Sequence, residues 1–288
     1  MPIHKYICFF IFIAITLYFF IAFENYNRRQ RASVLFGLLS VAVVTKILDA
    51  ISLCMSARNP VATFYMGCLP LFSCDIGLII GIVLLILHLL HPEKSYYTID
   101  RFIVYMILFN SLVPFLFPEF STSDARGIEQ ATEAFFTRPN LYELDNSIVH
   151  SIYFSFSLLY ARWNNIFKKP IKGYWKCLVI YSGIVLGVHI INLILSAFGL
   201  EPEYMYTMNA EYRIVPIFRA IFGNVLGIKL AGLFQAPIIE NVFGATGVYC
   251  AFMTLVYLIH VILYKNYKKK GLDNLFYNNL IYPNDTFI

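Results

Sequence analysis

Residues 33–91 read SVLFGLLSVAVVTKILDAISLCMSARNPVATFYMGCLPLFSCDIGLIIGIVLLILHLLH. This stretch holds two apolar runs, each long enough to cross a bilayer. Three ionisable residues, Lys46, Asp49 and Asp75, interrupt the runs. A charge at membrane depth is costly, so such residues usually face the protein interior and serve a function. The stretch therefore predicts a helical membrane protein with a polar interior.

Composition extends this prediction to the whole chain. Of its 288 residues, 59% are hydrophobic and 14% are charged, and the mean hydropathy is +0.67. A soluble domain carries about 25% charged residues, so this chain could not cover a water-facing surface. The net charge of +5 is concentrated in short loops, which indicates membrane topology and argues against a nucleic-acid partner.

Length and hydropathy predict seven membrane-spanning helices, with eight as the alternative. The seven are expected at residues 6–24, 33–56, 64–90, 101–118, 146–162, 176–199 and 243–264. The run 214–234 carries Arg219, Asn224 and Lys229, and we expect it to be re-entrant, interfacial or an eighth span. The fold class is thus an all-α polytopic helix bundle, with residues 1–288 forming a single membrane-embedded domain.

Basic residues mark the loops that should lie in the cytosol. They are Arg28, Arg29 and Arg31 after the first run, and Arg162, Lys168, Lys169, Lys172 and Lys176 between the fifth and sixth. The rule that cytoplasmic loops are positively charged then places the N-terminus outside. The acidic loop 119–145 is expected outside as well. The basic loop 162–176 is expected to offer a surface for a cytosolic partner.

Three titratable residues on three predicted helices reach one level of the bilayer. Lys46, Asp75 and His189 each lie about 15 Å from the outer end of their helix, at a rise of ~1.5 Å per residue. Asp49 lies one turn from Lys46 on the same face, and Asn192 lies one turn from His189. These five residues are the predicted ligand-binding set, in a polar cavity in the outer half of the bundle.

A structural role for the same charges remains open. Lys46 and Asp49 could neutralise each other within one helix, and Asp75 could bond to a serine or a backbone group. An unpaired charge at the centre of a membrane helix costs about 2.5–3.5 kcal/mol, so pairing alone could account for the set.

The functional prediction is a multi-pass membrane protein that binds a small ligand or ion, either receptor-like or a transporter. The alternative is a membrane-embedded, lipid-modifying enzyme of the transferase type, with His189 as general base and Asn192 as the residue that orients it. The chain contains no GxSxG, HExxH, P-loop or dinucleotide motif. The sequence therefore assigns no catalytic residue and no cofactor, and the membrane is either the plasma membrane or an endomembrane.

Three other kinds of residue pair in the sequence give weaker evidence of a structure or a function. His88 and His91 form an HxxH without a third ligand, so they are expected to reach the membrane interface rather than to bind a metal. Cys54 and Cys68 flank one short loop and could form a disulfide, although buried free thiols are the usual state of such residues. Gly-xxx-Gly pairs at 77/81, 183/187 and 223/227 predict close helix packing.

Overall fold

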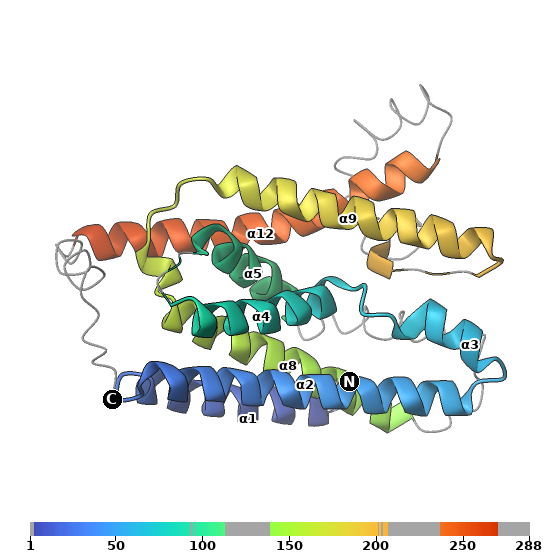
Figure 1. The fold of residues 1–288 in the computed structure, drawn as a ribbon, viewed down its shortest axis with the longest axis horizontal. Helices are drawn as coiled ribbons and strands as arrows, with labels where there is room; N and C mark the ends of the chain where they lie inside the picture. The colour runs from blue at the N-terminus through green and yellow to red at the C-terminus, as the bar shows by residue number, and fades with distance from the viewer. Residues whose placement is uncertain are drawn as a thin grey trace.

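The computed structural model of the chain describes residues 3–92, 94, 96–112, 139–200, 202, 204–206 and 237–269. In these ranges it is all-α and contains no strand (Figure 1). The α-helices are α1 (Ile3–Ala22), α2 (Arg28–Ser56), α3 (Pro60–Thr63), α4 (Ser73–Leu90), α5 (Tyr97–Asn110), α8 (Pro139–Trp163), α9 (Tyr174–Ala197) and α12 (Pro237–Lys269). Three short turns of other helix types are η1 (Phe64–Cys68), η2 (Ile166–Lys168) and η3 (Tyr204–Tyr206). The predicted all-α fold class is confirmed.

Among the described residues, four helices are long and apolar enough to cross a membrane. They contain the stretches Arg28–Met55, Ser73–Leu90, Tyr174–Ala197 and Tyr249–Lys269. Helix α1 holds a shorter apolar stretch, Phe9–Ala22. The predicted integral membrane protein is therefore confirmed. The run 214–234 lies outside the described residues, so the choice between seven and eight spans stays a prediction, as does the orientation.

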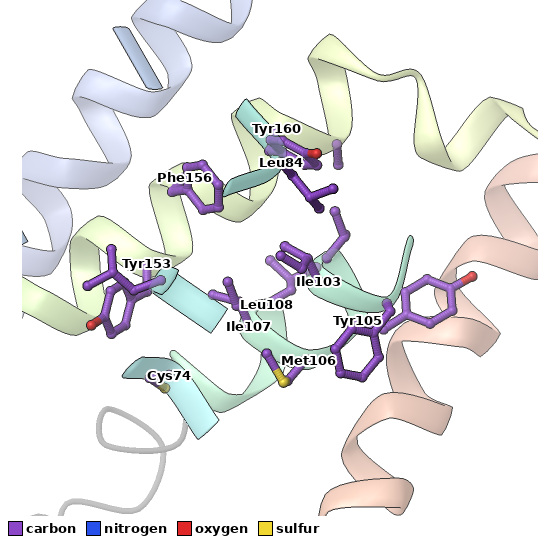
Figure 2. Close-up of a cluster of buried hydrophobic side chains, with 14 of the residues drawn as sticks. Cys74, Leu84, Ile103, Tyr105, Met106, Ile107, Leu108, Tyr153, Phe156 and Tyr160 are labelled. Atoms are coloured by element: carbon purple, nitrogen blue, oxygen red, sulfur yellow. The ribbon is translucent and has the colours of Figure 1, made fainter. Parts of the chain in front are cut away.

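Helix α5 lies at the centre of the bundle and packs against α4, α8, α9 and α12 (Figure 1). Its residues 102–108 are at most 8% exposed, so every face of this helix is covered. A helix that is apolar all round is stable only when neighbours surround it. Figure 2 shows Ile103 and Ile107 of α5 in one buried cluster with Leu84 of α4 and Phe156 of α8. Helices α1 and α2 pack against α8.

Most of the described helices begin earlier than the sequence predicted, and the N-terminal side chains of α2 show why in its case. The side chain of Asn27 accepts a 2.9 Å hydrogen bond from the Gln30 N–H, and the Gln30 side chain accepts one of 2.9 Å from the Asn27 N–H. This capping box starts α2 at Arg28, inside the predicted loop. The arginines of that loop therefore lie in the first turn and a half of α2. Helix α8 begins at Pro139 rather than at residue 146.

The predicted continuous helix at 64–90 is wrong. The segment forms η1, a non-helical stretch at residues 69–72, which we call the break, and then α4. The backbone of Leu69 is extended, with φ −67° and ψ 138°. Pro70 is the cause, because proline disfavours a helical conformation in the residue before it and supplies no N–H. Asp75 therefore lies in the first turn of α4 instead of the middle of a long helix.

Glycines of α4 allow its close packing against neighbouring helices. A Cβ atom at Gly77 would lie 2.6 Å from Cγ1 of Ile107 in α5, and one at Gly81 would lie 3.0 Å from a ring atom of α8. A Cβ atom at Gly183 or Gly187 of α9 would meet no heavy atom within 4 Å in the described part of the chain. The first predicted Gly-xxx-Gly pair is thus a packing contact and the second is not. The third lies outside the described residues.

Candidate functional site

The charged residues of α2 lie on the same face as its buried leucines. Residues of this face recur every three or four positions, namely Leu35, Leu39, Ala42, Lys46, Asp49 and Leu53. The Nζ atom of Lys46 lies 3.2 Å from Oδ1 of Asp75 in α4. The Asp75 side chain is 7% exposed and that of Lys46 is 38% exposed, so the carboxylate is buried and the lysine side chain is partly exposed. Tyr153 of α8 donates a 3.1 Å hydrogen bond to the same carboxylate oxygen.

Uncharged polar side chains form a group of hydrogen bonds around the start of α4. The Asn110 Nδ2 atom, at the end of α5, donates to the Ser73 Oγ at 3.1 Å and to the Tyr181 hydroxyl of α9 at 3.0 Å. All three residues are at most 6% exposed. Cys74 lies between Ser73 and Asp75 and is 8% exposed. We call Lys46, Ser73, Asp75, Asn110, Tyr153 and Tyr181 the polar cluster; five helices contribute to it.

A second network holds the break itself. The Tyr204 hydroxyl accepts a 3.0 Å hydrogen bond from the Leu69 N–H and donates one of 3.0 Å to the carbonyl of Tyr65. The carbonyl of Tyr204 accepts a 2.8 Å hydrogen bond from Nδ2 of Asn192 in α9. Tyr204 is fully buried. The backbone groups that Pro70 frees from helical bonding are therefore partly satisfied by a tyrosine side chain, as a membrane interior requires.

His189 lies on the buried face of α9 between these two networks. That face carries Tyr181, Val185, Val188, His189 and Asn192. Tyr181 contacts the start of α4 through Asn110, and Asn192 contacts the break through Tyr204, so His189 is bracketed by contacts to the segment 65–73. It is 4% exposed, and neither ring nitrogen has a hydrogen-bond partner in the described part of the chain.

The structure brings some of the predicted ligand-binding residues together and keeps others apart. Lys46 and Asp75 form an ion pair, and Asp49 follows one turn along α2. His189 and Asn192 reach the segment before α4 from another side. Asn192 makes its hydrogen bond to the backbone of Tyr204 rather than to His189. Their role in binding a ligand stays a prediction, as does the polar cavity.

Sequence reasoning missed the neutral partners. Tyr153, Tyr181 and Tyr204 are tyrosines within or beside apolar segments, where a tyrosine usually signals packing. Asn110 was the one residue of this group that the sequence could have marked as hydrogen-bonded, because an amide near the end of an apolar run needs a hydrogen-bond partner. Its partners, however, lie on other helices and cannot be deduced from spacing along one.

The other end of α4 carries a separate buried group. His88 Nε2 lies 2.8 Å from Oδ1 of Asp100, which also accepts a 2.6 Å hydrogen bond from the Tyr160 hydroxyl. His88 is 6% exposed and its ring packs edge-on against Trp163. Asp100 thus holds His88 inside the bundle instead of letting its side chain turn outward, and an interfacial level for this residue stays a prediction.

Cys54 and Cys68 meet as free thiols. Their Sγ atoms lie 3.8 Å apart, a sulfur hydrogen-bond distance, and both residues are half-buried. The expected proximity is present without the disulfide.

Only some of the basic side chains of the loop 162–176 contact acidic or aromatic side chains of the described part of the chain. Arg162 forms an ion pair with Glu24 at 2.6 Å, and the two lysines around the end of η2 lie over tyrosine rings at 5.6 and 5.2 Å. Lys172 and Lys176 are exposed. A cytosolic partner at this loop stays a prediction.

Comparison with known proteins identifies the family. The sequence profile of the TMEM164 family matches residues 2–264, most of the chain, so the chain belongs to this family. No curated protein and no solved structure matches it.

Proposed function

We propose that this member of the TMEM164 family is a membrane-embedded, lipid-modifying enzyme of the transferase type, with His189 as its general base. The observation that supports the proposal most is the buried imidazole of His189, whose two nitrogens have no partner in the described part of the chain. A buried histidine with a structural role is normally hydrogen-bonded. One without partners is available to a substrate.

The position of His189 suits proton transfer. A neutral imidazole offers one nitrogen lone pair and one N–H, so it can accept a proton and later return it. In a transfer reaction, His189 would take the proton of an attacking hydroxyl or thiol as the new bond forms. It would then give that proton to the leaving oxygen. The bracketing contacts of Tyr181 and Asn192 hold this face of α9 against the start of α4.

The surroundings favour a lipid substrate. Helices α2 and α9 expose apolar side chains such as Ile47, Leu48, Ile190 and Ile194, which suit contact with acyl chains. The start of α4 also offers one nucleophile, the thiol of Cys74. Replacing Cys74 with serine would show whether a thiol takes part in the transfer.

The test is product formation from an isotope-labelled phospholipid by the purified full-length protein in detergent. His189→Gln should lower the rate by a factor on the order of 10²–10⁴, which is the contribution of a positioned general base. His91→Gln is the matched control, because His91 is the C-cap residue at the opposite end of α4. A wild-type protein that forms no product from a panel of phospholipids, or equal rates for His189→Gln and wild type, would exclude this enzyme.

The second candidate is a transporter or receptor for a small ligand or ion, which the ion pair of Lys46 with the buried Asp75 favours. A buried carboxylate beside an ammonium can exchange its partner for a bound ion or proton. Uptake into vesicles driven by a proton gradient would support the transporter, provided that Asp75→Asn abolishes it. Uptake that Asp75→Asn leaves intact would exclude the pair as its site.

A further inference from the structure

Arg101 is a fully buried cation whose charge has no carboxylate partner among the described residues. It lies in the first turns of α5, is 1% exposed, and forms no ion pair in the described part of the chain. Its Nε and Nη1 atoms have no hydrogen-bond partner there. Its guanidinium packs over the ring of Tyr97, with Cζ 4.8 Å from the ring centroid. A buried charge left without a counter-charge costs several kcal/mol, so an anion is the expected partner.

The surroundings of Arg101 add positive charge. Lys169 Nζ lies 5.2 Å from the centroid of the same Tyr97 ring. The backbone of this region is fixed, because His260 Nε2 lies 3.0 Å from the carbonyl of Lys169 and the Tyr97 hydroxyl donates to the carbonyl of Pro170. Since a carbonyl only accepts, His260 carries its proton on Nε2 and its other nitrogen accepts from a tyrosine hydroxyl of α5.

The N-terminus of α9 faces the same guanidinium. A Cβ atom at Gly173 would lie 3.5 Å from Nη2 of Arg101 and 3.8 Å from Cδ of Lys176, so Arg101 points at the first residues of α9. Gly173 has φ 76°, in the left-handed region that glycine adopts without strain. No side chain caps this helix end and no acidic residue lies in its first turn. Its free N–H groups and the helix dipole favour an anion.

The carboxylate of the preceding residue is already engaged elsewhere. Asp100 precedes Arg101, but its carboxylate is bound to His88 and Tyr160 on the side of α4 and α8. It therefore does not neutralise the guanidinium, although it lies close enough to act on Lys169 through space.

We infer that Arg101, Lys169, Lys176 and the N-terminus of α9 form a binding site for a phosphate group. The planar fork of arginine matches two phosphate oxygens, and backbone N–H groups at a helix start match the others. Lys176 is exposed and Gly173 is half-buried, so the guanidinium lies directly beneath the protein surface at these two residues. This site is separate from the polar cluster and does not depend on the proposed enzyme function.

The position in the bundle favours a phospholipid headgroup as the source of that phosphate. Helix α9 begins at the end of the bundle where α2 begins and α12 ends (Figure 1). Trp175, next to the site, is 63% exposed, and exposed tryptophans of membrane proteins lie at the headgroup level. A free phosphate has the same chemistry, so the experiment distinguishes the two.

The experiment uses the purified full-length protein in detergent and follows lipid binding by native mass spectrometry. The probes are phosphatidylglycerol and diacylglycerol, which differ in the phosphate group, and inorganic phosphate is added as a competitor. Lys176→Gln removes an exposed charge of the site. Arg101→Lys keeps the buried charge but removes the planar guanidinium that can bind two phosphate oxygens at once. Lys268→Gln, an exposed lysine of α12, is the matched control.

We expect phosphatidylglycerol to bind with saturation and diacylglycerol not to bind at this site. Arg101→Lys should weaken binding about tenfold and Lys176→Gln somewhat less, while Lys268→Gln has no effect. Competition by inorganic phosphate would show that the site takes phosphate from either source; its absence would restrict the site to headgroups. Equal binding of both lipids, or wild-type binding by folded Arg101→Lys and Lys176→Gln proteins, would overturn the inference.

Discussion

Lys46 of α2 and Asp75 of α4 form an ion pair, with Nζ and Oδ1 3.2 Å apart, directly after the break at residues 69–72. The pair joins two helices, whereas the sequence pointed only to an intrahelical pairing of Lys46 with Asp49. Asp75 also receives a hydrogen bond from Tyr153 and lies in the first turn of α4, where the helix dipole favours a negative charge. Pro70, by breaking the helix, creates that position.

The pair predicts unequal effects of removing its two members. Lys46→Met leaves a buried carboxylate without its counter-charge and should destabilise the protein by about 3 kcal/mol. Asp75→Asn leaves the Lys46 side chain, which is 38% exposed and can turn its ammonium away from the site, so it should cost less than Lys46→Met. Unfolding of both variants and of the double variant, by titration with SDS in mixed micelles, measures these differences.

The double variant provides the decisive comparison. Because it removes both charges, it should be more stable than Lys46→Met alone. Additive losses would show that the two residues act independently, and would contradict a coupled pair.

His189 should affect activity without supporting stability. Because its ring nitrogens have no partner in the described part of the chain, His189→Leu removes an unsatisfied buried polar group. We expect the free energy of unfolding to stay the same or to rise by about 1 kcal/mol. Asn192→Leu is the contrasting variant, since it removes the hydrogen bond to Tyr204 and should cost about 1–2 kcal/mol. A large loss of stability for His189→Leu would indicate a structural role and would weaken the proposed base.

Two glycines of the same pattern should respond in opposite directions to alanine. Gly77→Ala places a methyl group 2.6 Å from Cγ1 of Ile107, and overpacking of this kind costs about 1–3 kcal/mol. Gly183→Ala meets no heavy atom within 4 Å in the described part of the chain and should gain up to about 1 kcal/mol from helix propensity. Thermal unfolding in one detergent compares the two. Equal losses would show that the α9 face of Gly183 is packed in the membrane, for example against another copy of the chain.

The fold could be predicted from the sequence as far as the length of the apolar runs determines it. Runs of apolar residues located the described helices, because backbone groups in lipid must be bonded within a helix. The break at 69–72 was missed because LPLF is itself apolar, and hydropathy does not distinguish an extended apolar segment from a helical one. Pro70 carried the missing signal.

The candidate site was predictable only in its charges. Lys46 and Asp75 were expected at one depth, and the structure pairs them although the assumed helix was wrong. The tyrosines that complete the networks were not identified, because their partners depend on how helices are arranged. Arg101 was assigned to a helix start without a role, since nothing in its neighbouring sequence shows that it would be buried.

The stability of the chain should depend on Lys169 in the alkaline range. Burial lowers the pKa of Lys169 from its ordinary 10.5, and the nearby charge of Asp100 opposes this only in part. Below the lowered pKa, the charged lysine makes folding less favourable. As the pH rises through that pKa toward 10.5, Lys169 loses its proton in the folded state before it does so in the unfolded state. The unfolded state then binds more protons than the folded state, so the stability of the folded protein rises. Wild type should therefore gain stability relative to Lys169→Met in the alkaline range, as the pH rises through the lowered pKa toward 10.5. Lys172→Met is the control, because Lys172 is an exposed lysine of the same loop. Parallel stability curves for wild type and Lys169→Met would show that Lys169 has the same pKa in the folded and unfolded states, and that it contributes no buried charge next to Tyr97.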